Sequence, residues 1–128
     1  MVSFPNWAKK TILVVEDEEV NRFFFETALK MTKVNLLFAE TGWEGISMAQ
    51  KHQNIDCVLM DIRLPGIDGY EATRHIKAER KNLPIIVQTA YALSNDRAKA
   101  FESGCDEFLS KPIRLGNLFE VLAKYMDD

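Results

Sequence analysis

The chain has 128 residues, of which 47% are hydrophobic and 27% charged, with a formal net charge of −3 and a sequence pI of about 5.4. This length fits one domain with its own core, and the acidic balance argues against direct binding of DNA or RNA. The two cysteines have no metal-binding or disulfide spacing, and a signal peptide and a membrane-spanning apolar run are lacking, so we expect a cytoplasmic protein.

Short apolar segments alternate with amphipathic stretches along the chain. The apolar segments span 11–15, 34–39, 57–60, 84–88 and 107–110, and the helical patterns span 18–31, 42–52, 69–80, 94–103 and 115–126. Such alternation is typical of a parallel sheet with helices on both faces. The sequence therefore predicts a doubly wound α/β fold, preceded by a tail at residues 1–10.

The first helical pattern carries apolar residues on more than one side. A stripe at helical spacing predicts the buried face of this helix: Val20, Phe24, Phe25, Ala28 and Met31. Phe23 points away from the centre of that stripe. It either folds over the surface of its own helix or stays exposed, where it could dock the helices of a partner protein.

Polar side chains follow four of the predicted strands. Ligands of an open parallel sheet bind beyond the carboxyl ends of its strands, so we expect these side chains to share one site. They are Glu16 and Asp17 after the first strand, Asp61 after the third, Thr89 after the fourth and Lys111 after the fifth.

This set of side chains suits one kind of chemistry. Three carboxylates at adjoining strand ends repel one another, and Mg²⁺ offsets such repulsion while leaving coordination positions for phosphate oxygens. A lysine ammonium and a threonine hydroxyl complement a phosphoryl group. Together these groups predict aspartyl phosphorylation. Taken singly, each has a simpler interpretation as a helix-end charge, a loop acid or a strand-end cap.

Four separated motifs stand along the chain in the order ILVVEDEEVNR, VLMDIRLPGIDGYE, IIVQTAYA and DEFLSKPI. In this order they resemble the receiver domain of two-component response regulators, over about residues 10–126. The resemblance implies a flavodoxin-like fold with five parallel strands in the order 2-1-3-4-5 and five helices, with the receiver domain at 11–128. The segments EVNR and DEFLSKPI are particularly similar to receivers of hybrid histidine kinases, so the chain is either a stand-alone receiver or part of a longer protein.

The resemblance implies a metal site and a phosphoacceptor. Asp61 is the implied phosphoacceptor. Mg²⁺ would be bound directly by Asp17 and Asp61, through water by Glu16, and by the main-chain carbonyl of Arg63. Glu16 stands where many relatives have aspartate, which is a mild variation.

The resemblance also implies the residues that switch. Thr89 is the switch hydroxyl, and Lys111 is the lysine that pairs with the phosphoryl group and precedes Pro112 through a cis peptide bond. Phe108 takes the position of the aromatic switch, where many relatives have tyrosine, so the phenol hydroxyl is missing here. Tyr91 and Arg63 occupy variable positions that tune the phosphoryl lifetime in this family.

The implied function is signal reception in a phosphorelay. A histidine kinase or a histidine phosphotransfer protein would donate the phosphoryl group, and a surface of the fourth helix, fifth strand and fifth helix would then control a downstream protein or an attached output domain. Phosphorylation-dependent homodimerisation is one form such control takes. The domain is implied to be a switch rather than an enzyme, although it catalyses its own phosphorylation and dephosphorylation, and it needs no nucleic acid or membrane partner.

Three alternatives stay open from the sequence. A phosphatase of the haloacid dehalogenase type also uses an aspartate nucleophile, Mg²⁺ and a lysine, but it needs a second acid where this chain has Arg63. A flavin-binding flavodoxin-like protein would need a phosphate cradle where this chain has the acidic loop EDEEVNR. A receiver that has lost phosphorylation would lack one of the site residues, and none is missing here.

Overall fold

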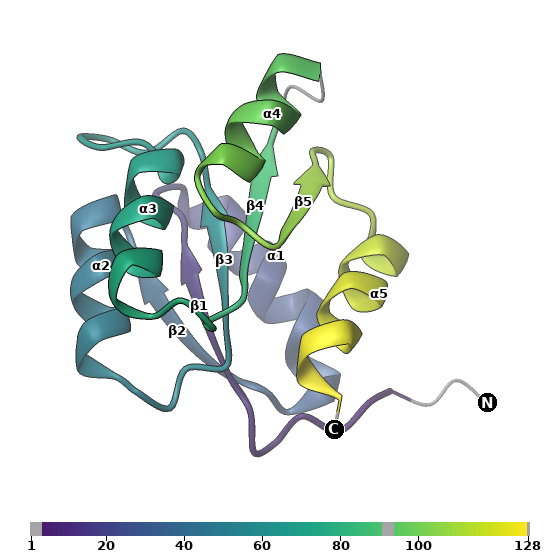
Figure 1. The fold of residues 1–128 in the computed structure, drawn as a ribbon. Coiled ribbons are helices and arrows are strands. Elements are labelled where there is room, and N and C mark those ends of the chain that lie inside the picture. Colours follow the sequence, from purple (N-terminus) through teal and green to yellow (C-terminus); the bar gives the residue numbers. More distant parts are fainter. Residues whose placement is uncertain (1–3, 91–93, 128) are drawn as a thin grey trace.

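A parallel sheet forms the centre of the molecule (Figure 1). The computed structural model describes residues 4–90 and 94–127, without the side chains of 94–96. The strands in these residues are β1 (Thr11–Val15), β2 (Asn35–Ala39), β3 (Cys57–Asp61), β4 (Ile85–Thr89) and β5 (Glu107–Ser110). They lie in the order β2-β1-β3-β4-β5, which confirms the order that the family resemblance implied.

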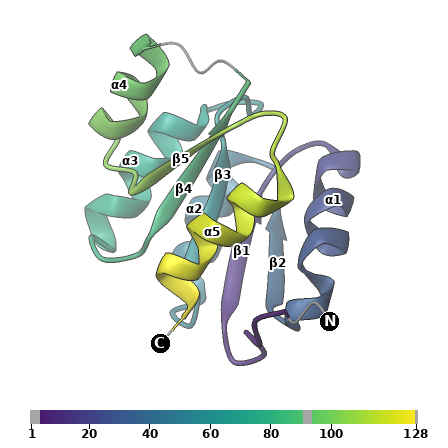
Figure 2. The ribbon, with the colours of Figure 1, turned by 90° about the vertical axis from the view of Figure 1, so that its right-hand side faces the viewer.

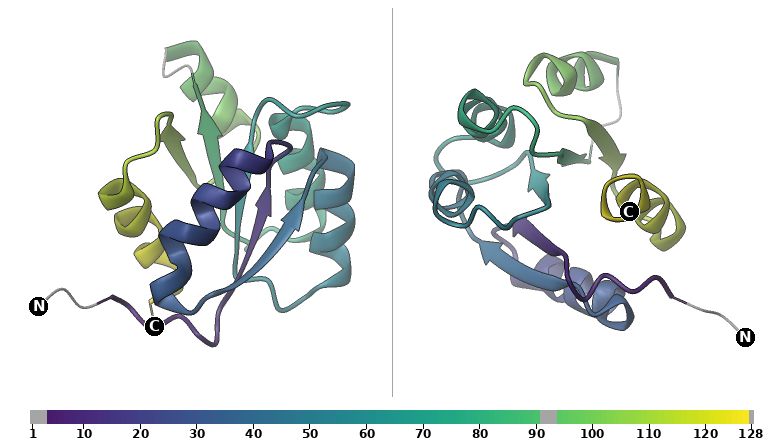
Figure 3. Two further views of the ribbon diagram at one scale, coloured as in Figure 1. Left: turned by 180° about the vertical axis from the view of Figure 1, so that it is seen from behind. Right: turned by 60° about the horizontal axis from the view of Figure 1, so that its bottom comes forward.

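Helices cover both faces of the sheet (Figures 2 and 3). They are α1 (Glu19–Leu29), α2 (Gly42–Lys51), α3 (Gly69–Glu79), α4 (Ser94–Glu102) and α5 (Leu115–Met126), with a 3₁₀ turn, Lys30–Thr32, after α1. The helices α1 and α5 pack on one face, and α2, α3 and α4 pack on the other. The predicted doubly wound α/β fold is therefore confirmed. In the described part of the chain, no helix has the length and apolar character that crossing a membrane requires.

The central strands are buried on both sides because neighbouring residues point to opposite faces. In β1, Leu13 and Val15 join the core under α2, α3 and α4, whereas Ile12 and Val14 join the core under α1 and α5. Burial of one such side chain contributes about 1.5–3 kcal/mol. These near-continuous apolar strands hold the carboxyl ends of β1, β3 and β4 in fixed positions.

The buried face of α1 differs from the prediction. Phe25 and Leu29 are 1% exposed, but Val20, Phe24 and Met31 of the expected stripe are 69%, 36% and 61% exposed. The prediction was wrong at these three positions because α1 contacts the sheet along one i, i+4 row. In addition, Met31 belongs to the turn after α1 rather than to the helix.

Residues 4–10 pack against the domain. The Trp7 side chain is 2% exposed, its ring centroid lies 5.9 Å from that of Phe119, and its Nε1–H donates to Oδ1 of Asp127 over 2.9 Å. The main-chain N–H of Trp7 donates to the carbonyl oxygen of Thr32 over 2.7 Å. This segment therefore joins the end of α5 to the turn after α1. The domain boundary at residue 11 stays a prediction.

Candidate functional site

The carboxyl ends of the strands lie at one edge of the sheet (Figure 1), and polar residues stand at several of these ends. Asp61 ends β3 opposite Gln88, and Thr89 ends β4 opposite Ser110. Lys111 follows β5, and its main-chain N–H donates to the carbonyl oxygen of Thr89 over 2.7 Å. The parallel topology thus places the ends of β3, β4 and β5 next to one another, as the sequence predicts.

Three carboxylates form the acidic side of this site. One oxygen atom from each of Glu16, Asp17 and Asp61 lies within 4.8 Å of the other two. Glu16 is 0% exposed and Asp61 is 3% exposed, so two of the three groups have little solvent around them. Two unit charges about 4 Å apart repel by about 4 kcal/mol at an effective dielectric constant near 20. A divalent cation between these oxygens would remove that repulsion.

Glu16 is a buried carboxylate with a raised pKa. Its Oε2 accepts a hydrogen bond from the main-chain N–H of Glu18 over 3.2 Å, while its Oε1 has no hydrogen-bond partner among the described residues. Burial, followed by repulsion from Asp61, raises the pKa of Glu16 from 4.5 to about 7. The site therefore contains a buried acceptor atom that a cation or a water molecule would complete.

Lys111 supplies the positive charge of the site. Its Nζ donates to Oδ1 of Asp61 over 3.1 Å and lies 3.9 Å from Oε1 of Glu16. The peptide bond between Lys111 and Pro112 is cis, as the resemblance implied. One ammonium faces three carboxylates, so it offsets only part of their negative charge.

The connection from β3 to α3 passes very close to Asp61. The main-chain N–H of Gly69 donates to the carbonyl oxygen of Ile62 over 2.9 Å, and a Cβ atom on Gly69 would lie 2.2 Å from the carbonyl oxygen of Asp61. A side chain cannot occupy that position without a backbone shift. Glycine at the start of α3 therefore lets this helix pack against the end of β3.

We expect Gly69→Ala to lower the free energy of unfolding by about 1–3 kcal/mol, because overpacking against a backbone atom displaces the strand end. Gly116→Ala is the matched control, since a Cβ atom there would meet no atom within 4 Å. That control should stabilise α5 by about 0.5–1 kcal/mol. Urea unfolding of both variants checks this pair, and equal effects at the two glycines would contradict the close approach at Gly69.

The remaining predicted site residues lie around this cluster. Thr89 is buried at the end of β4. Phe108 on β5 is partly buried against the core, with Cζ of Arg97 5.7 Å from its ring centroid. Arg63 lies in the exposed part of the connection from β3 to α3. Tyr91 lies outside the described residues.

Comparison with known proteins assigns a family to this arrangement. Residues 12–123 match the model of the response regulator receiver domain. The chain belongs to this family. The receiver is 31% identical over 121 residues to the polar-differentiation response regulator DivK of Brucella ovis, an alignment that covers 93% of this chain and 98% of DivK.

Solved receiver structures resemble this one over most of its length. The receiver domain of the sensor histidine kinase PA1611 from Pseudomonas aeruginosa, which has a magnesium ion coordinated in its active-site cleft, has a TM-score of 0.85 and 34% identity, with 93% of this chain and 98% of that chain covered. A chain in the co-crystal structure of the Saccharomyces cerevisiae histidine phosphotransfer protein Ypd1 with the receiver domain of Ssk1 has a TM-score of 0.86 and 26% identity, with 98% and 92% covered. Membership of the receiver family sets aside the phosphatase and flavin-binding alternatives.

Two residues of this receiver site were missed by sequence reasoning. The guanidinium Nη1 of Arg22 donates to the carbonyl oxygen of Glu16 over 2.9 Å and so ties α1 to the end of β1. Gln88 lies beside Asp61 in the sheet register and is 1% exposed. The sequence does mark Gln88, because it is the one polar residue in the apolar segment PIIVQ. Nothing marks Arg22, because an arginine in a helical pattern is usually a surface residue.

Proposed function

We propose that this receiver acts in a cytoplasmic phosphorelay, taking a phosphoryl group onto Asp61 from the phosphohistidine of a histidine kinase or a histidine phosphotransfer protein. The contact that supports this most directly is the 3.1 Å hydrogen bond from Lys111 Nζ to Oδ1 of Asp61, made inside a cluster of carboxylates at the strand ends. Lys111 holds the Asp61 carboxylate in place, and a phosphoryl group on Asp61 would lie within reach of the same ammonium.

The transfer exchanges one bond to phosphorus for another. An oxygen of the Asp61 carboxylate attacks phosphorus, the P–N bond of the phosphohistidine breaks, and the imidazole leaves with the bonding electron pair and is then protonated. Hydrolysis of the resulting acyl phosphate by water restores Asp61 and releases inorganic phosphate. Because Asp61 is 3% exposed, it reacts only with a phosphorus atom that is presented from the open side of the site.

The acidic cluster fits Mg²⁺ as the cofactor of this reaction. We assign direct coordination to Asp17 and Asp61, a water-mediated contact to Glu16, and the third protein ligand to the main-chain carbonyl of Arg63. The buried Oε1 of Glu16, which lacks a hydrogen-bond partner in the described residues, agrees with a cation or its water at this place. When bound, Mg²⁺ would neutralise the carboxylates and polarise the phosphoryl oxygens.

The outer side of α1 is proposed to receive the phosphodonor. Val20 and Phe23 are 69% and 64% exposed, so Phe23 does not fold over its own helix. Together with Phe24 they form an apolar strip beside the acidic site. A protein that carries histidine on a helix bundle could bury this strip while its phosphohistidine faces Asp61. The receiver domain of Ssk1 has been co-crystallised with the histidine phosphotransfer protein Ypd1, so a receiver of this fold binds a partner of that class.

The signal is proposed to leave through β4 and β5. Phosphorylation adds about −1.5 to −2 charges and three acceptor oxygens, which attract the Thr89 hydroxyl and the Lys111 ammonium. The main-chain N–H of Lys111 donates to the carbonyl oxygen of Thr89 and so links the ends of these two strands. A shift of one strand end would therefore displace the other. Two charge-assisted hydrogen bonds at about 1.5–3 kcal/mol each approach the roughly 5.5 kcal/mol that converts a 1:99 equilibrium into 99:1.

The proposed output surface consists of α4, β5 and α5. A pocket of about 270 Å³ lies between these elements, with Arg97 and Phe108 on one side and Asn117 and Glu120 on the other. The Phe108 ring could move inward if Thr89 shifts, although it has no hydroxyl to bond with. We propose that this surface controls a downstream protein, an attached output domain or a second receiver.

Intact mass measurement tests the proposed function. The chain is incubated with acetyl phosphate and Mg²⁺, and we expect one phosphoryl adduct on the wild type, none on Asp61→Asn, and none when EDTA removes the metal. Asp56→Asn is the matched control, because Asp56 is an aspartate at the other end of β3, and it should accept the phosphoryl group normally. An adduct on Asp61→Asn would move the acceptor elsewhere, and no adduct on the wild type would favour a receiver that has lost phosphorylation.

A further inference from the structure

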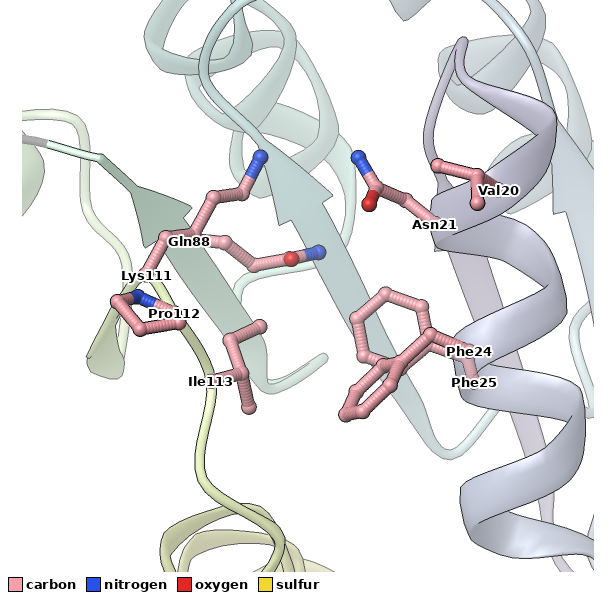
Figure 4. Close-up of a pocket in the computed structure, with 8 residues that line it drawn as sticks. All are labelled: Val20, Asn21, Phe24, Phe25, Gln88, Lys111, Pro112 and Ile113. Atoms are coloured by element: carbon pink, nitrogen blue, oxygen red, sulfur yellow. The ribbon is translucent and has the colours of Figure 1, made fainter.

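A pocket opens between α1 and the segment after β5, next to the acidic site (Figure 4). Its volume is about 340 Å³, which falls within the range of roughly 300–1,000 Å³ that is usual for small-molecule sites. The walls are mainly apolar, with Phe24 and Phe25 on α1 and Ile113 after β5. Lys111 lines both this pocket and the acidic site, so the two are neighbours.

The base of the pocket holds a polar group that the protein does not satisfy. Gln88 is 1% exposed, and neither its Oε1 nor its Nε2 has a hydrogen-bond partner among the described residues. Its carboxamide extends from β4 into the pocket toward the phenyl rings of Phe24 and Phe25 (Figure 4). Buried amides are normally hydrogen-bonded, so a carboxamide placed at the end of an open pocket indicates that its partner comes from outside the chain.

The donor and acceptor of Gln88 define the chemistry of that partner. A carboxamide offers an N–H donor beside a carbonyl acceptor, and it pairs best with a group that presents an acceptor beside a donor in one plane. A primary carboxamide and a lactam both have this edge. The phenyl rings and Ile113 would contact an apolar or aromatic body attached to it.

Charges of both signs lie close to the pocket, so a ligand that carries either charge would meet a repulsive group. The carboxylates of Glu16, Asp17 and Asp61 lie beyond Lys111 and would repel an anion. The ammonium of Lys111 would repel a cation, and it already donates to Asp61. We propose that this pocket binds a small neutral molecule with a carboxamide or lactam edge on an apolar body, and that Gln88 reads that edge through a pair of hydrogen bonds.

Benzamide is the probe for this proposal, because it combines a phenyl ring with a primary carboxamide. In ¹⁵N-edited NMR spectra of the whole chain, we expect benzamide to shift the side-chain amide resonances of Gln88 and the main-chain resonances of Phe24 and Ile113. N,N-dimethylbenzamide, which lacks the donor, should bind about tenfold more weakly, as should benzoate, which is charged. This measurement needs no phosphorylation, so its result is independent of the proposed function.

Variants separate recognition by Gln88 from general apolar binding. Gln88→Met keeps a side chain of similar length and should weaken benzamide binding by about tenfold while the chain stays folded. Phe24→Ala removes one wall of the pocket and should also weaken binding, whereas Phe101→Ala, which truncates an exposed phenylalanine on α4, should leave it unchanged. The proposal is overturned if saturating benzamide shifts no pocket resonance, if benzamide and its dimethyl derivative bind equally well, or if Gln88→Met binds benzamide as the wild type does.

Discussion

Lys111→Met should slow the phosphorylation of Asp61 by acetyl phosphate by about 10²–10³-fold, because it removes a positioned donor to the charge that develops on the transferred group. Nζ of Lys111 lies 3.1 Å from Oδ1 of Asp61, and the Lys111 side chain is only 26% exposed. Water that entered after its removal would therefore replace the ammonium poorly as a hydrogen-bond donor. The same ammonium is proposed to pair with the phosphoryl oxygens after transfer. Removal of the ammonium should therefore slow adduct formation and also weaken the conformational change of α4, β5 and α5 that follows phosphorylation. A time course of intact mass measures the rate.

Two further variants separate charge from geometry at this position. Lys124→Met removes a lysine that forms an exposed ion pair with Glu107 at the start of β5, the end opposite Lys111, and this variant should be phosphorylated at the wild-type rate. Lys111→Arg keeps the positive charge but replaces a compact ammonium with a planar guanidinium, so we expect an intermediate rate. If Lys111→Met gains its adduct as fast as Lys124→Met does, the proposed role of Lys111 is wrong.

The sequence predicts the location of the site well because of one physical regularity. Strands buried on both faces read as apolar runs, so a charged residue such as Asp61 directly after a run marks the carboxyl end of a strand. Parallel strands bring those ends to one edge, and this places Asp61, Thr89 and Lys111 together without any knowledge of distances. The order of the strands, by contrast, came from the resemblance to receivers, because apolar periodicity gives the number of strands and not their neighbours.

The buried face of α1 shows the limit of periodicity. The pattern of apolar residues marks a sector of the helix, but the angle at which the helix lies on the sheet decides which row of that sector is covered. In this chain the row of Phe25 and Leu29 is covered, and Val20 and Phe24 border a pocket instead. Phe24 and Val20 look the same as core residues in the sequence, so only the structure separates them.

The N-terminal segment and Gln88 were missed for different reasons. Residues 4–10 are too short to show a period, so the apolar Trp7 gave no sign of the contacts that it makes with Phe119 and Asp127. Gln88 interrupts an apolar strand and was visible in the sequence. Its lack of a partner, however, depends on the side chains around it in three dimensions, and no local pattern records that.

Glu16→Gln should stabilise the metal-free protein at pH 8 by about 3 kcal/mol at most, because it removes a buried charge whose pKa is raised from 4.5 to about 7. A carboxyl group with a raised pKa binds its proton more tightly in the folded state. The contribution of Glu16 to the stability of the wild type is therefore greatest below about pH 4.5. This contribution is lost as the pH rises from there through about 7. Glutamine still offers an oxygen to the main-chain N–H of Glu18, so the variant keeps that hydrogen bond.

The stability that Glu16→Gln gains over the wild type should depend on both the pH and the presence of Mg²⁺. In urea unfolding with EDTA, the difference between Glu16→Gln and the wild type should shrink toward zero as the pH falls from 8 to 5. Glu26→Gln, which removes an exposed carboxylate from α1, should change stability by less than about 0.5 kcal/mol at either pH.

Addition of Mg²⁺ should reverse the order of the two proteins. A ligand that binds only the folded state stabilises it in proportion to the logarithm of its concentration over the dissociation constant. The wild type presents three carboxylates to the cation and Glu16→Gln presents two, so the wild type should gain more from the same concentration of Mg²⁺. A variant that is no more stable than the wild type in EDTA at pH 8 would show that Glu16 is not a destabilising charge. A variant that gains as much from Mg²⁺ as the wild type would remove Glu16 from the metal site. We expect Glu16→Gln to be more stable than the wild type in EDTA and to lose this advantage in Mg²⁺. That result would show that the buried carboxylate of Glu16 lowers the stability of the metal-free protein but strengthens cation binding.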